Sequence, residues 1–150
     1  MVTSQPGQQA PAADQDGLVD ALAQAAFATM AVLTKAAADH DLSLTQLRVL
    51  AILRDRRLRM TALADYLGLE KSTMSGLVER AERRGLLERA PSPADGRAVE
   101  VFLSPAGAEL AQRGHARIIR SLSPMTGQLA PAEQRRLQTL LERLLGTHGS

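Results

Sequence analysis

Cysteine is absent from this 150-residue chain, and aromatic residues make up only 2% of it. Without cysteine, the chain cannot form disulfides, cysteine-based zinc sites or thiol redox sensors. The hydrophobic content is 45%, and it must come mainly from leucine, alanine and valine, which suits packed helices better than a β-sandwich. The length is that of one domain or one compact subunit.

Membrane and export signals are also missing. No uninterrupted apolar run approaches the roughly 18–20 residues needed to cross a bilayer, and the N-terminus lacks the basic-then-apolar order of a signal peptide. We therefore expect a cytoplasmic protein with no membrane partner. The net charge is +2, which is too small to predict nucleic-acid binding, so the positions of the charges must decide that question.

The sequence contains no motif in which catalytic or metal-binding residues occur at the required spacing. The histidines His40, His115 and His148 are scattered and have no carboxylate or second histidine at helical spacing. There is no Ser/His/Asp spacing, no Gly-rich phosphate loop and no carboxylate pair on a common face. We therefore expect no enzyme activity, no catalytic residues, no cofactor and no metal site.

The two ends of the chain differ from its middle. Residues 1–15 are rich in Gln, Pro and Ala and predict a flexible tail. Residues 16–42 and 104–146 predict a helical dimerisation region, because their long apolar faces need a partner. Ser104-Pro105 is a typical helix start, and Pro124 is expected to end that helix near Leu122. We therefore expect a homodimer.

The middle segment, residues 43–103, predicts a DNA-binding module. Ser43 and Gln46 form a capping box before a helix that should turn Leu47, Leu50 and Leu53 inward. A basic run follows, in which Asp55 is the single acidic residue among Arg54, Arg56, Arg57 and Arg59. Thr61 is the expected N-cap of the next helix, and Gly68 fits its left-handed C-terminal position.

A second helix should run from about Glu70 to Arg84 and end at Gly85. Two strands, 87–92 and 98–103, are predicted around the turn at Pro93-Ala-Asp-Gly96. The fold class is therefore mainly α with a small β-wing, a winged helix-turn-helix with N- and C-terminal dimerisation helices. In such a fold the second helix enters the major groove, and an arginine at the ribbon tip suits a minor groove.

The surface of the second helix has the side chains that groove entry requires. Met74, Leu77, Val78 and Ala81 should pack inward, which leaves small hydroxyl residues facing outward with Arg80 on the flank. Asp95 could hold the Arg97 guanidinium in a bidentate pair, and Glu79 could pair with Arg80. The residues expected to contact DNA are Thr61, Lys71, Ser72, Thr73, Ser75, Gly76, Arg80, Asp95 and Arg97. Ordinary solvated side chains are the alternative interpretation of each feature taken alone.

Three segments carry a family resemblance: ERRGLLER, the wing motif Asp95-Gly96-Arg97, and the run from Leu103 to Gly107, LSPAG. Together with LTQLRVLAIL and TALADYLGLEKSTMSGLVER, they make the chain resemble the MarR family of bacterial transcriptional regulators over about Ala21 to Leu145. The resemblance implies a homodimer that reads a palindrome, with Ser72 to Arg80 in the major groove and Arg97 in the minor groove, braced by Asp95. It also implies a repressor that releases DNA when a small, often phenolic or anionic, ligand binds in a crevice beside the dimer helices.

Two departures from the family pattern are visible. Gly76 stands where many members carry a long basic or polar side chain, so Arg80 or Ser75 must supply specificity. Aromatic walls for a ligand are scarce, and Phe27, His40 and His115 are the candidate ligand-binding residues. We predict a ligand-responsive repressor that binds a pseudo-palindromic operator in double-stranded DNA. The alternative is a winged-helix protein-interaction module without specific DNA binding, against which the basic run and the intact wing argue.

Overall fold

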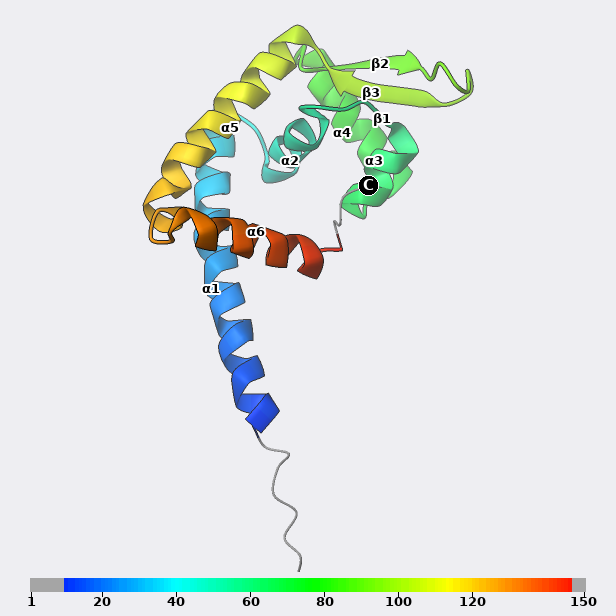
Figure 1. Cartoon of the computed structure of the whole chain (residues 1–150). Helices are drawn as coiled ribbons and strands as arrows, with labels where there is room; N and C mark the ends of the chain where they lie inside the picture. The colour runs from blue at the N-terminus through cyan, green and yellow to red at the C-terminus, as the bar shows by residue number, and fades with distance from the viewer. Residues whose placement is uncertain (1–9, 147–150) are drawn as a thin grey trace, which may run out of the picture.

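The computed structural model describes residues 10–146, with side chains described from residue 15 onward. It shows a mainly helical chain with a small antiparallel sheet, which confirms the predicted fold class (Figure 1). Within that range the elements are α1 (Ala10–Ala38), α2 (Leu44–Leu53), β1 (Leu58–Arg59), α3 (Met60–Leu67), α4 (Lys71–Arg83), β2 (Leu87–Pro91), β3 (Val99–Leu103), α5 (Pro105–Thr126) and α6 (Pro131–Leu144).

Two helix boundaries differ from the prediction. Helix α1 begins at Ala10 and not at Asp16, so the predicted tail is helical from residue 10, and residues 1–9 lie outside the described range. Helix α5 continues through Pro124 to Thr126. Proline has no N–H to donate to the carbonyl of Arg120, but the Ser123 hydroxyl donates to that carbonyl at 3.0 Å. This local replacement lets the helix continue two residues past the proline, to Thr126.

The sheet has one strand more than the predicted two-stranded ribbon. Strand β1 pairs with β3, which gives the antiparallel order β1-β3-β2. Two residues are too few to show the alternation by which strands are predicted. The predicted N-cap of α3, Thr61, is wrong. Arg59 is the N-cap, and Thr61 lies inside the first turn of the helix. The predicted left-handed Gly68 is confirmed, with φ of 66°.

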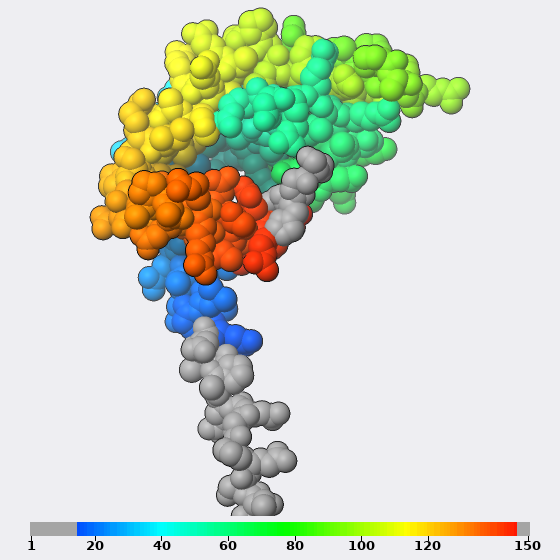
Figure 2. All heavy atoms as spheres, viewed as in Figure 1, coloured from blue at the N-terminus to red at the C-terminus, as the bar shows by residue number. Residues whose placement is uncertain are grey.

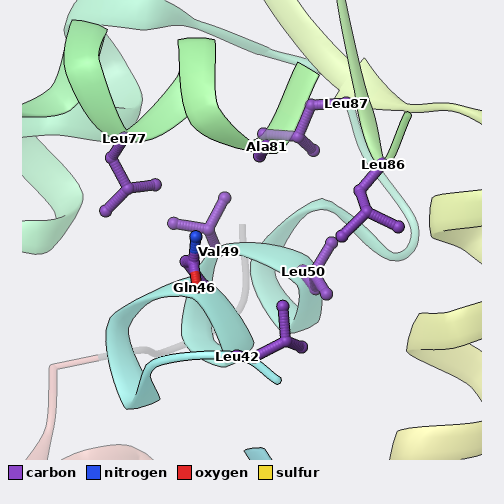
Figure 3. A pocket seen from close by; sticks show the side chains of 8 residues that line it. All are labelled: Leu42, Gln46, Val49, Leu50, Leu77, Ala81, Leu86 and Leu87. Carbon is purple, nitrogen blue, oxygen red and sulfur yellow. The ribbon is translucent and has the colours of Figure 1, made fainter. Parts of the chain in front are cut away.

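The core lies between α2, α3, α4 and the sheet. Leu63, Met74, Val49, Val78 and Val101 are almost completely buried, and the predicted inward residues of α2 are buried as well. Figure 3 shows Val49 and Leu50 of α2 directed toward side chains of α4 and of the start of β2, around a gap of about 10 Å³. A gap of that size is at the lower limit for one water molecule, so this is core packing and not a ligand site.

The turn that follows α4 packs directly against the start of α5. The Ser104 hydroxyl donates to the carbonyl of Gly85 at 2.5 Å and accepts the N–H of Gly107 at 3.0 Å. A Cβ added to Gly107 would lie 2.0 Å from the carbonyl oxygen of Leu86. Glycine at 107 is therefore required by the close approach of two backbones, one from each of the ERRGLLER and LSPAG segments.

Helices α1 and α6 leave much apolar surface uncovered. Figure 2 shows the N-terminal part of α1, in blue, projecting away from the rest of the molecule, whereas its C-terminal part packs against α2 and α5. The exposed large apolar side chains on α1, α5 and α6 are Leu18, Val19, Leu22, Phe27, Met30, Ile119, Met125, Leu137, Leu140, Leu141 and Leu144. Segment Gln15–Ala38 is long and apolar enough to cross a membrane by length and composition, with mean hydropathy 1.5. Its apolar character is largely alanine, however, and Asp20 and Lys35 interrupt it.

Candidate functional site

A hollow of about 360 Å³ lies between α3, α4 and the base of the wing, and we call it the basic hollow. Its lining contains four basic side chains and no carboxylate: Arg59, Met60, Thr61, Lys71, Ser75, Arg89, Arg97, Ala98 and Val99. Such a concentration of positive charge at a concave surface attracts phosphate groups.

Sheet pairing brings Arg59 and Arg89, which are far apart in the sequence, to the same part of the molecule. Strands β1 and β2 flank β3, so Arg59 and Arg89 stand one strand away on either side of it. Arg89 is held by an ion pair with Glu82 of α4, with 2.6 Å between its Nε and Oε1. In the part of the chain that the structure describes, Arg59, Lys71 and Arg97 form no ion pair.

Two of the four basic residues of the hollow, Arg59 and Arg89, are missing from the predicted DNA-binding set. Arg59 belongs to the basic run, but the run itself does not show which arginine faces the site. Arg89 belongs to a five-residue strand whose side-chain direction depends on its pairing with β3. The signal that could have identified Arg89 is its position two residues after buried Leu87, which places the two side chains on the same face of the strand. That signal can be used only once the strand pairing is known.

The outer face of α4 adjoins the basic hollow. Met74, Leu77, Val78 and Ala81 are buried, as predicted. Ser72, Thr73 and Arg80 are exposed, whereas Ser75 and Gly76 are half-buried. Of the predicted set, the structure brings Thr61, Lys71, Ser75 and Arg97 together in the hollow. It leaves the remaining α4 residues on the adjoining helix face and Asp95 in the turn of the wing.

Arg80 lies over the glycine one turn before it. A Cβ built on Gly76 would be 3.4 Å from Nη1 of Arg80. The guanidinium therefore occupies the space above Gly76 that a longer side chain at this position would fill. Among the described residues, Glu79 and Arg80 form no ion pair, so Glu79 does not aim Arg80.

The wing turn is organised by Asp95, but not in the predicted way. Its Oδ1 accepts the main-chain N–H of Arg97 at 3.1 Å, and its carbonyl accepts the N–H of Ala98 at 3.0 Å. The predicted bidentate pair with the Arg97 guanidinium is wrong, because no such pair is formed within residues 10–146. A short carboxylate reaches the backbone two residues ahead more readily than the end of a long side chain.

The basic run is less uniform than its sequence indicates. Arg56 pairs with Asp55 at 3.4 Å, between Nε and Oδ1. Arg57 pairs with Glu100 at 3.6 Å and lies 3.7 Å from the centre of the Phe102 ring. The expectation that Asp55 alone opposes these arginines is therefore wrong, because β3 contributes a second carboxylate.

A second hollow, of about 480 Å³, lies between α1, α2 and α5, and we call it the aliphatic hollow. Its lining is Met30, Leu33, Leu44, Thr45, Leu47, Arg48, Ala51 and Ile118. The three predicted ligand-binding residues are not in this lining. Phe27 is 77% exposed, and His115 lines an adjacent gap of about 30 Å³ that shares Leu47, Ala51 and Ile118 with the aliphatic hollow. The carbonyl of His40 accepts a hydrogen bond from Arg84 at 3.0 Å.

Metal binding finds no support in the described residues, which contain no group of three or more His, Asp or Glu side chains that could hold an ion.

A helix-turn-helix with a β-wing and a basic hollow between them defines a winged-helix DNA-binding protein. Residues 40–98 match the model of the MarR family. The multiple antibiotic resistance protein MarR of Salmonella typhimurium is 30% identical over 107 residues, which cover 70% of this chain and 74% of that protein. The chain therefore belongs to the MarR family of DNA-binding transcriptional regulators, which are not enzymes.

One further relative by sequence and two solved structures are also similar to this chain. The uncharacterized HTH-type transcriptional regulator YfiV of Bacillus subtilis is 32% identical over 87 residues, 55% of this chain, and the match spans about half of that protein, 54%. The structure of NadR in complex with 4-hydroxyphenylacetate has a TM-score of 0.74 at 21% identity, covering 96% of this chain and 97% of that one. A mutant form of MarR from E. coli, complexed with operator DNA, has a TM-score of 0.64 at 23% identity, covering 87% and 92%. At these identities the two structures show that the fold is shared.

Proposed function

We propose that this chain is a homodimeric, ligand-responsive repressor that recognises a pseudo-palindromic operator. Helix α4 would enter the major groove, and Arg97 of the wing would enter the neighbouring minor groove. The observation that carries the proposal is the basic hollow, because it lies between these two groove-reading elements, where the phosphate backbone must pass.

The side chains divide by the part of DNA that they would contact. Arg59 and Lys71, which form no ion pair within the described residues, would neutralise phosphates from the hollow, and Thr61 would contribute a hydroxyl at the start of α3. Ser72, Thr73 and Ser75 are short enough for the α4 backbone to approach base edges. Arg80 has the length and fork geometry to reach a guanine across Gly76.

Dimerisation would bury the apolar side chains that one copy leaves exposed on α1, α5 and α6. Side chains such as Leu18, Phe27 and Leu144 are 62%, 77% and 58% exposed, and patches of this kind mark interaction sites. We propose residues 16–42 and 104–146 as the dimerisation region and residues 43–103 as the DNA-binding module. Two copies related by a two-fold axis would place their α4 helices about 34–36 Å apart.

Ligand response is supported by the position of the aliphatic hollow. It lies between helices of the proposed dimerisation region and α2 of the DNA-binding module. A ligand seated there would alter the separation between α1 and α2, and through it the spacing of the two α4 helices. NadR, which shares this fold, was solved with a small phenolic acid. A protein that regulates transcription in this way would act in the cytoplasm.

The proposal is tested by fluorescence-anisotropy titration of the full chain with the DNA upstream of its own coding region. A scrambled duplex of equal length is the control, and both are measured at two salt concentrations. The proposal expects a clear preference for the upstream DNA and a steep loss of affinity with salt. Weak and equal binding to both duplexes, together with failure to enrich any sequence from a random library, would favour the protein-interaction module instead.

A further inference from the structure

The lining of the aliphatic hollow is mostly apolar, with its polar groups on one helix. Six of its eight residues are aliphatic or methionine, and they come from α1, α2 and α5. The two polar residues, Thr45 and Arg48, are both on α2. They are three residues apart, so they share one face of the helix. Any polar group of a ligand in this hollow would therefore be held on one side of it.

Arg48 is available to an anion. It is exposed, and within residues 10–146 no carboxylate pairs with it. By contrast, Arg117 of α5, close to the same helices, is already paired with Asp39. A guanidinium matches the two oxygens of a carboxylate in a bidentate geometry. The hydroxyl of Thr45 could donate a further hydrogen bond to the same group.

No aromatic side chain is among the residues that line the hollow. A ring-shaped ligand would therefore gain nothing from ring-to-ring contacts, which add to the burial of area where aromatic walls exist. An aliphatic ligand loses nothing by their absence, because its gain depends on the apolar area removed from water. Met30 and the leucines can adjust to a flexible chain of varying shape.

We infer that the aliphatic hollow binds a small aliphatic carboxylate. Its carboxylate pairs with Arg48 and Thr45, and its hydrocarbon body lies against Leu33, Leu47 and Ile118. The inference names the ligand class for the hollow that the proposed function treats as regulatory, and its effect on DNA rests on that proposal. Binding to the hollow itself does not.

The test is isothermal titration calorimetry of the full chain, without DNA, using straight-chain carboxylates from butanoate to decanoate. Affinity should rise by up to about fourfold for each added methylene, equivalent to about 0.8 kcal/mol, until the hollow is filled. Octanoate should bind at least about tenfold more tightly than octanamide, which lacks the charge, and more tightly than 3-phenylpropanoate.

Variants separate the two halves of the site. Arg48→Met should remove the preference for octanoate over octanamide but keep the dependence on chain length, and Arg48→Lys should keep part of the preference. Ala51→Phe should fill the hollow and weaken binding of every probe. Arg113→Met changes an exposed arginine of α5 outside the lining and should leave binding unchanged.

Several results would overturn the inference: equal affinity across the series, an unchanged preference in Arg48→Met, or tighter binding of 3-phenylpropanoate. Absence of binding by any probe, as would occur if a second copy covers the hollow, would also overturn it. Operator binding is measured on the same samples by anisotropy. Loss of octanoate binding with intact operator binding counts against this inference alone. Octanoate binding without operator release would support the site and contradict the ligand-responsive part of the proposed function.

Discussion

The guanidinium of Arg84 donates a 2.7 Å hydrogen bond to the main-chain carbonyl of Asp41. Arg84 is the C-cap residue of α4, and Asp41 turns the chain between α1 and α2 with a left-handed φ of 54°. A second hydrogen bond from Arg84 reaches the carbonyl of His40. The helix proposed to read DNA is therefore fastened at its C-terminal end to the corner that leads out of the proposed dimerisation helix.

Arg84→Met should lower the free energy of unfolding by about 1–2 kcal/mol, because two charge-assisted hydrogen bonds are lost from partly solvated carbonyls. Urea denaturation measures the change. Arg83→Met is the matched control, since Arg83 is exposed and its side chain forms no hydrogen bond or ion pair within the described residues. Equal effects in the two variants would show that the contact with Asp41 contributes nothing specific.

Gly107→Ala should destabilise the fold by about 2–3 kcal/mol. The new Cβ would lie 2.0 Å from the carbonyl oxygen of Leu86, so two backbones must move apart, at the cost typical of overpacking. Thermal and urea unfolding would measure it. Gly114→Ala, also in α5, meets no atom within 4 Å and should instead gain up to about 1 kcal/mol from helix propensity. A tolerated alanine at 107 would contradict the packing argument.

Arg97→Ala should weaken operator binding without lowering the melting temperature, because its side chain is exposed and proposed to enter a groove. Asp95→Asn keeps an oxygen that can accept the Arg97 N–H, so it should bind the operator at least as tightly as the parent protein. Asp95→Ala removes that acceptor and should bind more weakly. If Asp95→Asn were as impaired as Asp95→Ala, the charge of Asp95, and not the turn that it forms, would be the important feature.

Ser75→Ala should alter base preference more than non-specific affinity. Ser75 is half-buried at the edge of the basic hollow, on the face of α4 proposed to meet base edges. Selection from a randomised half-site, compared with affinity for a scrambled duplex, would measure both quantities. An equal loss on all sequences would show that Ser75 contacts a phosphate.

Arg59→Met should reduce the slope of log K against log salt by about 0.9, the contribution of one neutralised phosphate. Arg56→Met is the matched control from the same basic run, since Arg56 is paired with Asp55 and lies outside the hollow. Anisotropy titrations at four or more salt concentrations give the slopes. If both variants lowered the slope equally, the arginines would act as a diffuse charge and the basic hollow would have no special role.

Local chemistry determined a large part of this protein from sequence alone. The capping box at Ser43, the left-handed Gly68 and the Ser104-Pro105 start were each predictable because they involve residues within a few positions of one another. The inward face of α4 followed from helical spacing for the same reason. Fold class and family followed from the order of these local signals along the chain.

Tertiary structure alone decided how distant residues combine. Arg59 and Arg89 meet in the basic hollow because β1 and β2 both pair with β3, and a two-residue strand leaves no periodic pattern to detect. The pairing of β1 with β3 also brings Glu100 next to Arg57, with which it forms an ion pair. The lining of the aliphatic hollow also depends on how α1 and α5 pack against α2. Short-range hydrogen bonds and helical spacing depend only on residues that are close in the sequence, whereas strand register and helix packing depend on the whole core.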